Sequence, residues 1–144
     1  MTPVKPDQTL AWMKDGTRQV LGCVAGLPDA EYARMLASAE IAVVPSLYEG
    51  FSLPAVEHMA SGTPLVASRA GALPEVTGDA AVLVTPGDPE ELAAVLRALL
   101  DDPPERARLA AAGLARVQLR FAWPAVAAAT EALYRKVING EPDC

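Results

Sequence analysis

The stretch IAVVPSLYEGFSLPAVEHMASGTPLVAS, residues 41–68, decides the fold. It opens with an unbroken apolar run over 41–44, which predicts a parallel strand buried on both faces. A loop over 45–51 leads into a helix expected at 53–61, and residues 65–67 predict a second strand. This order of strand, helix and strand indicates a parallel sheet with helical crossovers.

The same alternation extends in both directions from this stretch. The remaining expected elements are a strand over 19–24, a helix over 28–39, a helical turn over 73–77, a strand over 81–84 and three helices beginning near 88, 104 and 124. Residues 1–17 lack a clear period and are expected to be irregular, residues 18–138 form one domain, and residues 139–144 form a frayed tail. The sequence therefore predicts a doubly wound α/β fold.

The helix expected from position 88 has the clearest start. Asp88 can cap it, Pro89 suits its first position, and Glu91 would complete a capping box. Two apolar stripes at helical spacing are expected to face inward on the last two helices. These are Ala110, Leu114, Val117 and Phe121 on the first, and Val126, Ala129, Leu133 and Val137 on the second.

Bulk properties exclude several functions. The net charge is −6 without a run of basic residues, so no nucleic acid binding is expected and membrane association is not indicated. Two cysteines, Cys23 and Cys144, form neither a disulfide framework nor a metal site. With no signal peptide or membrane-spanning run visible, a reduced, cytoplasmic location is expected.

In such folds ligands bind beyond the carboxyl ends of the strands. This rule selects the loops over 22–26, 45–51, 68–73 and 85–88. In the second loop, Gly50 permits close backbone approach, and Pro54 marks a helix N-terminus that favours an anion. We expect a phosphate at the amides of Ser52 and Leu53.

Two carboxylates bracket this expected anion site. Glu49 precedes the helix, and Glu57 lies about one turn inside it. A carboxylate can accept bonds from two vicinal hydroxyls, so a sugar diol and a ribose diol would satisfy both acids. The alternative is structural, because an acid near a helix start is often a dipole partner or simply solvated.

The motif also resembles a known family. Two glutamates separated by seven residues, Glu49-Gly-Phe-Ser-Leu-Pro-Ala-Val-Glu57, together with the segments 43–46, 58–68, 71–76 and 84–90, resemble the C-terminal domain of retaining GT-B glycosyltransferases of family four. The resemblance covers about 19–138 and implies a Rossmann-like domain that binds an NDP-sugar.

The resemblance also implies the role of each matching residue. Glu49 would bind donor-sugar hydroxyls near the reacting centre and is the candidate catalytic residue. Backbone amides over 50–53 would bind sugar and phosphate, Glu57 would hold the ribose, and Val24 would lie against the base. The implied substrate-binding residues are thus Val24, Glu49, Gly50, Phe51, Ser52, Leu53 and Glu57, with no metal and no cofactor besides the donor.

The sequence departs from the family in two respects. It lacks the upstream Gly-Arg-x-x-x-x-Lys-Gly-type segment and the N-terminal acceptor domain. We therefore expect a donor-binding half that is inactive alone, with the missing domain or a homo-oligomer as its partner. Arg69, at a strand end, could lie near the phosphates, whereas His58 is expected to have a surface or packing role.

Two other functions stay open. Another GT-B enzyme, such as a sugar-nucleotide epimerase or a phosphorylase, would share the architecture, although the context of Glu49 and Glu57 fits these enzymes poorly. A non-catalytic module that binds a nucleotide-sugar or a partner domain would need no acceptor site.

Overall fold

A computed structural model describes residues 28–140 of the chain. The strand expected over 19–24, the irregular segment 1–17, Val24 and both cysteines lie outside the described residues. Contacts divide the chain into two units, Met1–Met35 and Leu36–Cys144, and the packing below concerns the second.

The described strands form one parallel sheet, as the sequence predicts. The strands β1 (Ala42–Val44), β2 (Leu65–Ser68) and β3 (Ala81–Val84) lie in the order β1-β2-β3. Each strand pairs with the next one along the chain, so that Ala42 lies opposite Leu65 and Leu65 opposite Ala81. All three strands therefore end at the same edge of the sheet, where loops from different parts of the sequence meet.

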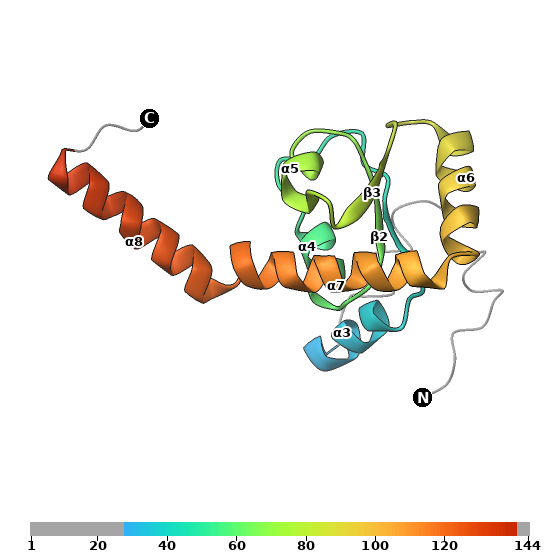
Figure 1. Ribbon diagram of the computed structural model, residues 1–144, viewed down its shortest axis with the longest axis horizontal. Helices are drawn as coiled ribbons and strands as arrows, with labels where there is room; N and C mark the ends of the chain where they lie inside the picture. The colour runs from blue at the N-terminus through green and yellow to red at the C-terminus, as the bar shows by residue number, and fades with distance from the viewer. Residues whose placement is uncertain (1–27, 141–144) are drawn as a thin grey trace. The chain divides into compact units, whose positions relative to one another are not determined.

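The helices follow the predicted positions closely. They are α3 (Asp29–Ala37), α4 (Leu53–Ala60), α5 (Leu73–Thr77), α6 (Pro89–Leu100), α7 (Pro103–Arg120) and α8 (Trp123–Asn139). The crossovers between strands are α4 and α5, whereas α6 lies on the other side of the sheet (Figure 1). Within residues 28–140, no helix combines the length and the apolar character that spanning a membrane requires.

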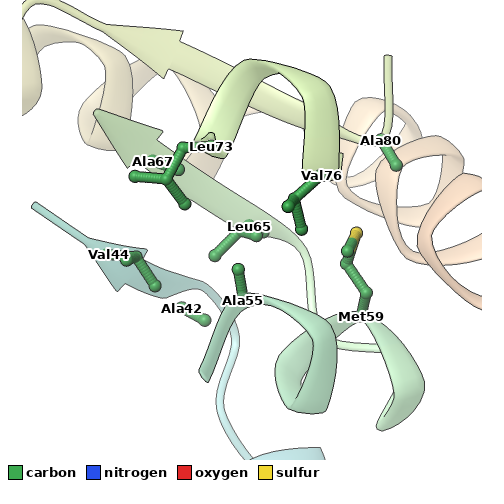
Figure 2. Packing of buried hydrophobic residues seen from close by; sticks show 9 residues of the cluster. All are labelled: Ala42, Val44, Ala55, Met59, Leu65, Ala67, Leu73, Val76 and Ala80. Atoms are coloured by element: carbon green, nitrogen blue, oxygen red, sulfur yellow. The ribbon is translucent and has the colours of Figure 1, made fainter. Parts of the chain in front are cut away.

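Two apolar clusters cover the two faces of the sheet. One contains Leu65 and Ala67 of β2 with Ala55 and Met59 of α4 and Leu73 of α5 (Figure 2). The other contains Val66 of β2 with Val84, Leu99 and Leu109, and α6 packs against it. Successive β2 residues thus point to opposite faces, as expected for a strand that is buried on both sides.

Helix α7 contacts both clusters, and its predicted inward face is correct in part, because Val117 and Phe121 pack against the first cluster. Its buried residues are Leu109 and Gly113, while Leu114 is 39% exposed. A Cβ added at Gly113 would lie 3.2 Å from the Cβ of Met59 and 3.3 Å from its Cα. The prediction missed Leu109 and Gly113, because a tight contact with α4 is made at a glycine, which an apolar stripe does not reveal.

The predicted inward face of α8 is also wrong for the described chain. No residue of α8 is buried, and Val126, Leu133 and Val137 are 37%, 47% and 68% exposed. A helical stripe shows that one face is apolar, but it cannot show which part of a protein covers that face.

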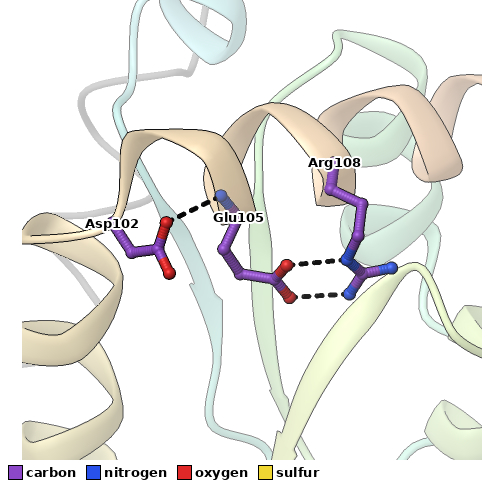
Figure 3. A network of polar contacts seen from close by, with 3 residues as sticks. All are labelled: Asp102, Glu105 and Arg108. Atoms are coloured by element: carbon purple, nitrogen blue, oxygen red, sulfur yellow. Dashed lines mark hydrogen bonds and ion pairs between the residues drawn. The ribbon is translucent and has the colours of Figure 1, made fainter.

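Two aspartates cap helices, as their position before proline suggests. Asp88 Oδ1 accepts from Glu91 N, but Glu91 Oε2 accepts from Thr85 N and not from the cap residue. Asp102 Oδ1 likewise accepts from Glu105 N, and Arg108 binds both Glu105 oxygens (Figure 3). The hydrogen bond from Arg108 lowers the pKa of Glu105 from its ordinary value of 4.5.

Candidate functional site

The loop between β1 and α4 carries the first predicted acid. Glu49 is half-buried, and its Oε1 accepts a hydrogen bond of 2.8 Å from Ser46 Oγ. Within the described chain, Oε2 of Glu49 has no partner. The hydrogen bond across the loop therefore orients the carboxylate, and no residue within 28–140 occupies its second oxygen, which could accept from a ligand.

Ser52, the residue that caps α4, has an unusual conformation. Its backbone is left-handed, with φ 76° and ψ 79°, and it is the one described non-glycine residue with positive φ. The residue is buried, yet Ser52 Oγ has no hydrogen-bond partner among residues 28–140. Both features cost free energy, and such costs gather at ligand-binding sites.

The first turn of α4 is open to an acceptor. The Ser52 side chain makes no capping bond, and Pro54 has no N–H to offer. In the part of the chain that the structure describes, the N–H groups of Ser52, Leu53 and Ala55 have no acceptor. Unpaired N–H groups at a helix start, with the positive end of the helix dipole, form a site for an anion.

The loop after β2 contacts the loop that carries Glu49. Ala72 N donates a 2.9 Å hydrogen bond to the backbone oxygen of Glu49. Gly71 has φ 52°, and a Cβ added to it would overlap this same oxygen and lie 2.9 Å from Glu49 N. The two loops, distant in sequence, are therefore in direct backbone contact at the carboxyl edge of the sheet.

Phe51 connects this edge to α7. Its ring meets that of Phe121, the residue that ends α7, edge to face, with 5.6 Å between centroids and 83° between planes. Because Phe51 immediately precedes Ser52, this aromatic contact helps to hold the start of α4.

Glu57 lies on α4 beside His58, and both residues are half-buried. Burial lowers the pKa of His58 from 6.5, and the Glu57 carboxylate opposes part of that change. His58 Nδ1 is buried and has no hydrogen-bond partner within the described residues. The half-buried position of His58 agrees with the surface or packing role expected for it.

A cavity of about 290 Å³ opens at the same edge of the sheet, on the side of α6. Its lining is Pro45, Ser68, Val84, Thr85, Gly87, Asp88, Pro89 and Leu92. Asp88 and the Thr85 N–H are already engaged at the start of α6. The cavity contains none of the predicted donor-binding residues, which follow the strands on the side of α4.

Besides the two glutamates, Arg69 is the charged residue that the sequence placed near the phosphates. Arg69 follows β2, is exposed, and makes no side-chain hydrogen bond or ion pair within residues 28–140. No three metal-binding side chains come together in the described part of the chain.

Three of the four predicted loops thus meet at one edge, and the fourth, over 22–26, lies outside the described residues with Val24. Sequence reasoning selected Glu49, the amides over 50–53 and Glu57 as a candidate site, which stays a prediction, and it did not select Ser46 or the contact of Gly71 and Ala72 with Glu49. Positive-φ glycines in a loop could have indicated such a contact, but not its partner.

Comparison with known proteins gives a consistent picture. A family model described as glycosyl transferases group 1 matches residues 5–102. An MMP alpha-(1->4)-mannosyltransferase of Mycolicibacterium hassiacum is 58% identical over 132 residues, which are 90% of this chain and 32% of that protein. The chain thus spans about a third of the length of this relative.

Solved structures agree with the fold. A sucrose-phosphate synthase of Thermosynechococcus elongatus has a TM-score of 0.66 at 37% identity, covering 85% of this chain and 34% of its own. The C-terminal domain of a group 1 glycosyl transferase of Francisella tularensis has a TM-score of 0.61 at 29% identity, and the match covers 83% of this chain and 65% of that one. HepE of Anabaena in complex with UDP has a TM-score of 0.63 at 26% identity, and the match covers 71% of this chain and 29% of that one. The predicted doubly wound α/β fold of a GT-B C-terminal domain is confirmed.

Proposed function

The chain belongs to the group 1 glycosyl transferases, and we propose that it is the donor-binding half of a transferase that moves a hexosyl unit from an NDP-sugar to an acceptor with retention of configuration. The observation that carries this proposal is the open N-terminus of α4, with Glu49 in the preceding loop and Glu57 on the helix itself.

Each part of the donor has a chemical counterpart at this helix start. The diphosphate would accept from the free N–H groups of Ser52, Leu53 and Ala55 and from the amides of Gly50 and Phe51, and the helix dipole would stabilise its charge. The free oxygen of Glu49 would accept from sugar hydroxyls near the reacting carbon. The Glu57 carboxylate would hold the ribose hydroxyls, and Val24 would lie against the base.

A mannosyl donor is the first candidate, because the 58% identical relative is a mannosyltransferase. The UDP complex of one structural neighbour supports nucleotide binding by this type of domain. We propose turnover for the whole protein only, and for the 144-residue chain we propose donor binding without transfer. The acceptor-binding domain or a second copy of the chain would be its partner.

Binding measurements on wild-type and variant chains test these roles. GDP-mannose, UDP-glucose and ADP-glucose, and the three free nucleotides, are titrated by calorimetry and by amide NMR shifts. Glu57→Ala should weaken binding of the free nucleotide and of the nucleotide-sugar alike by about tenfold. Glu49→Ala should weaken binding of the nucleotide-sugar only. Glu90→Ala removes the same charge from an exposed position on α6 and serves as the control.

The outcomes separate the proposed roles from the alternatives. A loss of free-nucleotide affinity from Glu49→Ala as large as that from Glu57→Ala would contradict the assigned polarity of the donor. Absence of binding by all six compounds would contradict nucleotide-sugar binding altogether and favour a module that binds only a partner domain.

A further inference from the structure

We infer that Gly71 and Ala72 are positioning residues of the donor site, which act by fixing the backbone of Glu49. The inference rests on the function proposed above, because it concerns the acid that would bind the donor sugar. Neither residue needs to touch the donor to have this effect.

The contact leaves no room for a side chain at position 71. A Cβ on Gly71 would overlap the Glu49 oxygen, lie 2.9 Å from Glu49 N and lie 3.1 Å from the carbonyl carbon. These are backbone atoms, which cannot rotate away as the end of a flexible side chain can. The φ of 52° at Gly71 also disfavours any other residue.

Ala72 supplies the attractive part of the contact. Its N–H donates to Glu49 O at 2.9 Å, and Ala72 is also the residue that caps α5. Leu73 and Val76 of α5 are buried in the core on the α4 side of the sheet. The position of Glu49 is therefore fixed from the core, through α5 and the Ala72 amide.

Glu49 is consequently held at both ends. Ala72 holds its backbone oxygen, and Ser46 Oγ donates to its carboxylate at 2.8 Å. A shift of the backbone would swing the carboxylate, and displacement of a positioning group by about 1 Å can change rates by as much as about 100-fold. Loss of the contact should therefore affect recognition of the sugar more than recognition of the nucleotide.

The test compares Gly71→Ala with a matched control, Gly62→Ala. Gly62 also has positive φ, 70°, but a Cβ there would meet only the Leu114 side chain, at 3.4 Å. Both variants are titrated with GDP and GDP-mannose and with UDP and UDP-glucose. Gly71→Ala should weaken binding of the nucleotide-sugar by about tenfold and binding of the free nucleotide by less than twofold. Gly62→Ala should change neither affinity.

A double-mutant cycle links the effect to Glu49. If Gly71 acts through this acid, Gly71→Ala should cause no further loss of nucleotide-sugar affinity in the Glu49→Ala chain. Additive losses would overturn the inference, as would equal loss of nucleotide and nucleotide-sugar, or no loss.

A second variant covers the case in which Gly71→Ala does not fold. Ala72→Pro deletes the donor N–H, and the Ala72 φ of −81° suits proline. It should reproduce the loss that is specific to the sugar, and unchanged affinity would overturn the inference. If the wild-type chain binds none of the four compounds, the proposed function fails instead, so the two failures are distinguishable.

Discussion

His58 shows how one buried side chain makes stability depend on pH. Burial lowers its pKa in the folded chain below 6.5, whereas the unfolded chain keeps the ordinary value. Below pH 6.5 the unfolded chain therefore binds more protons, so the contribution of neutral His58 is lost as the pH falls through the folded pKa.

We therefore expect the free energy of unfolding of the wild-type chain to fall between pH 7.5 and pH 5.5, relative to that of His58→Leu. Urea denaturation measures this difference, and NMR titration of the imidazole measures the pKa directly, since His58 is the only histidine. Glu57→Gln should lower the pKa further because it removes the opposing charge. A folded-state pKa of 6.5 or above would contradict this account.

For single residues, the sequence predicted a candidate site but not the contacts that hold its residues in place. The spacing of Glu49 and Glu57 and the proline after Ser52 are local signals, so they were readable. The left-handed backbone of Ser52, the absence of a partner for its hydroxyl among residues 28–140 and the contact of Gly71 with Glu49 depend on loops that meet only after folding. The assigned binding roles of these residues stay predictions until the titrations are made.

Between elements, the contact of α4 with α7 depends on the small size of Gly113. Its Cα approaches Met59 so closely that even a methyl group would require a small shift. Gly113→Val should lower the free energy of unfolding by about 2 kcal/mol through overpacking, as measured by urea denaturation.

Ala111→Val is the control for this prediction, because it places the same side chain at an exposed position of α7. Met59→Ala should partly restore the Gly113→Val chain by providing space, although it is destabilising alone. If Gly113→Val lowers the free energy of unfolding by no more than Ala111→Val does, the two helices can separate without cost.

The elements themselves were predictable because their signals are local. Apolar runs gave β1, β2 and β3, and the aspartate–proline pairs gave the starts of α6 and α7. The inward face was predicted correctly only in part for α7 and incorrectly for α8, because the burial of a face depends on the partner element. The predicted bond from Glu91 back to the cap residue is absent for a similar reason, because the Glu91 carboxylate accepts from Thr85 N instead.

Among the described residues, several large apolar side chains are exposed, including groups beside the predicted site and on α8. Leu47, Tyr48 and Leu53 are 74%, 79% and 65% exposed beside the predicted site, and Val137 and Ile138 are 68% and 82% exposed on α8. Apolar area of this kind favours association. We therefore expect the 144-residue chain to self-associate as its concentration rises.

Sedimentation velocity over a range of concentrations tests this expectation. Val137→Asp should shift the distribution toward the monomer, because it introduces a charge on the apolar stripe of α8. Ala128→Asp, which helical spacing places on the opposite face of α8 from Val137, should not. A wild-type chain that stays monomeric at high concentration would refute the prediction.

The order of the strands has a consequence for how this region forms. Each described strand pairs with the next strand along the chain. The two strands of each pair are therefore joined by a single short crossover, whose ends come together when the pair forms. Short closures lose little chain entropy and shorten the search for native contacts. The segment should therefore find its native pairing with less search than a parallel sheet of the same size whose neighbouring strands are distant in sequence.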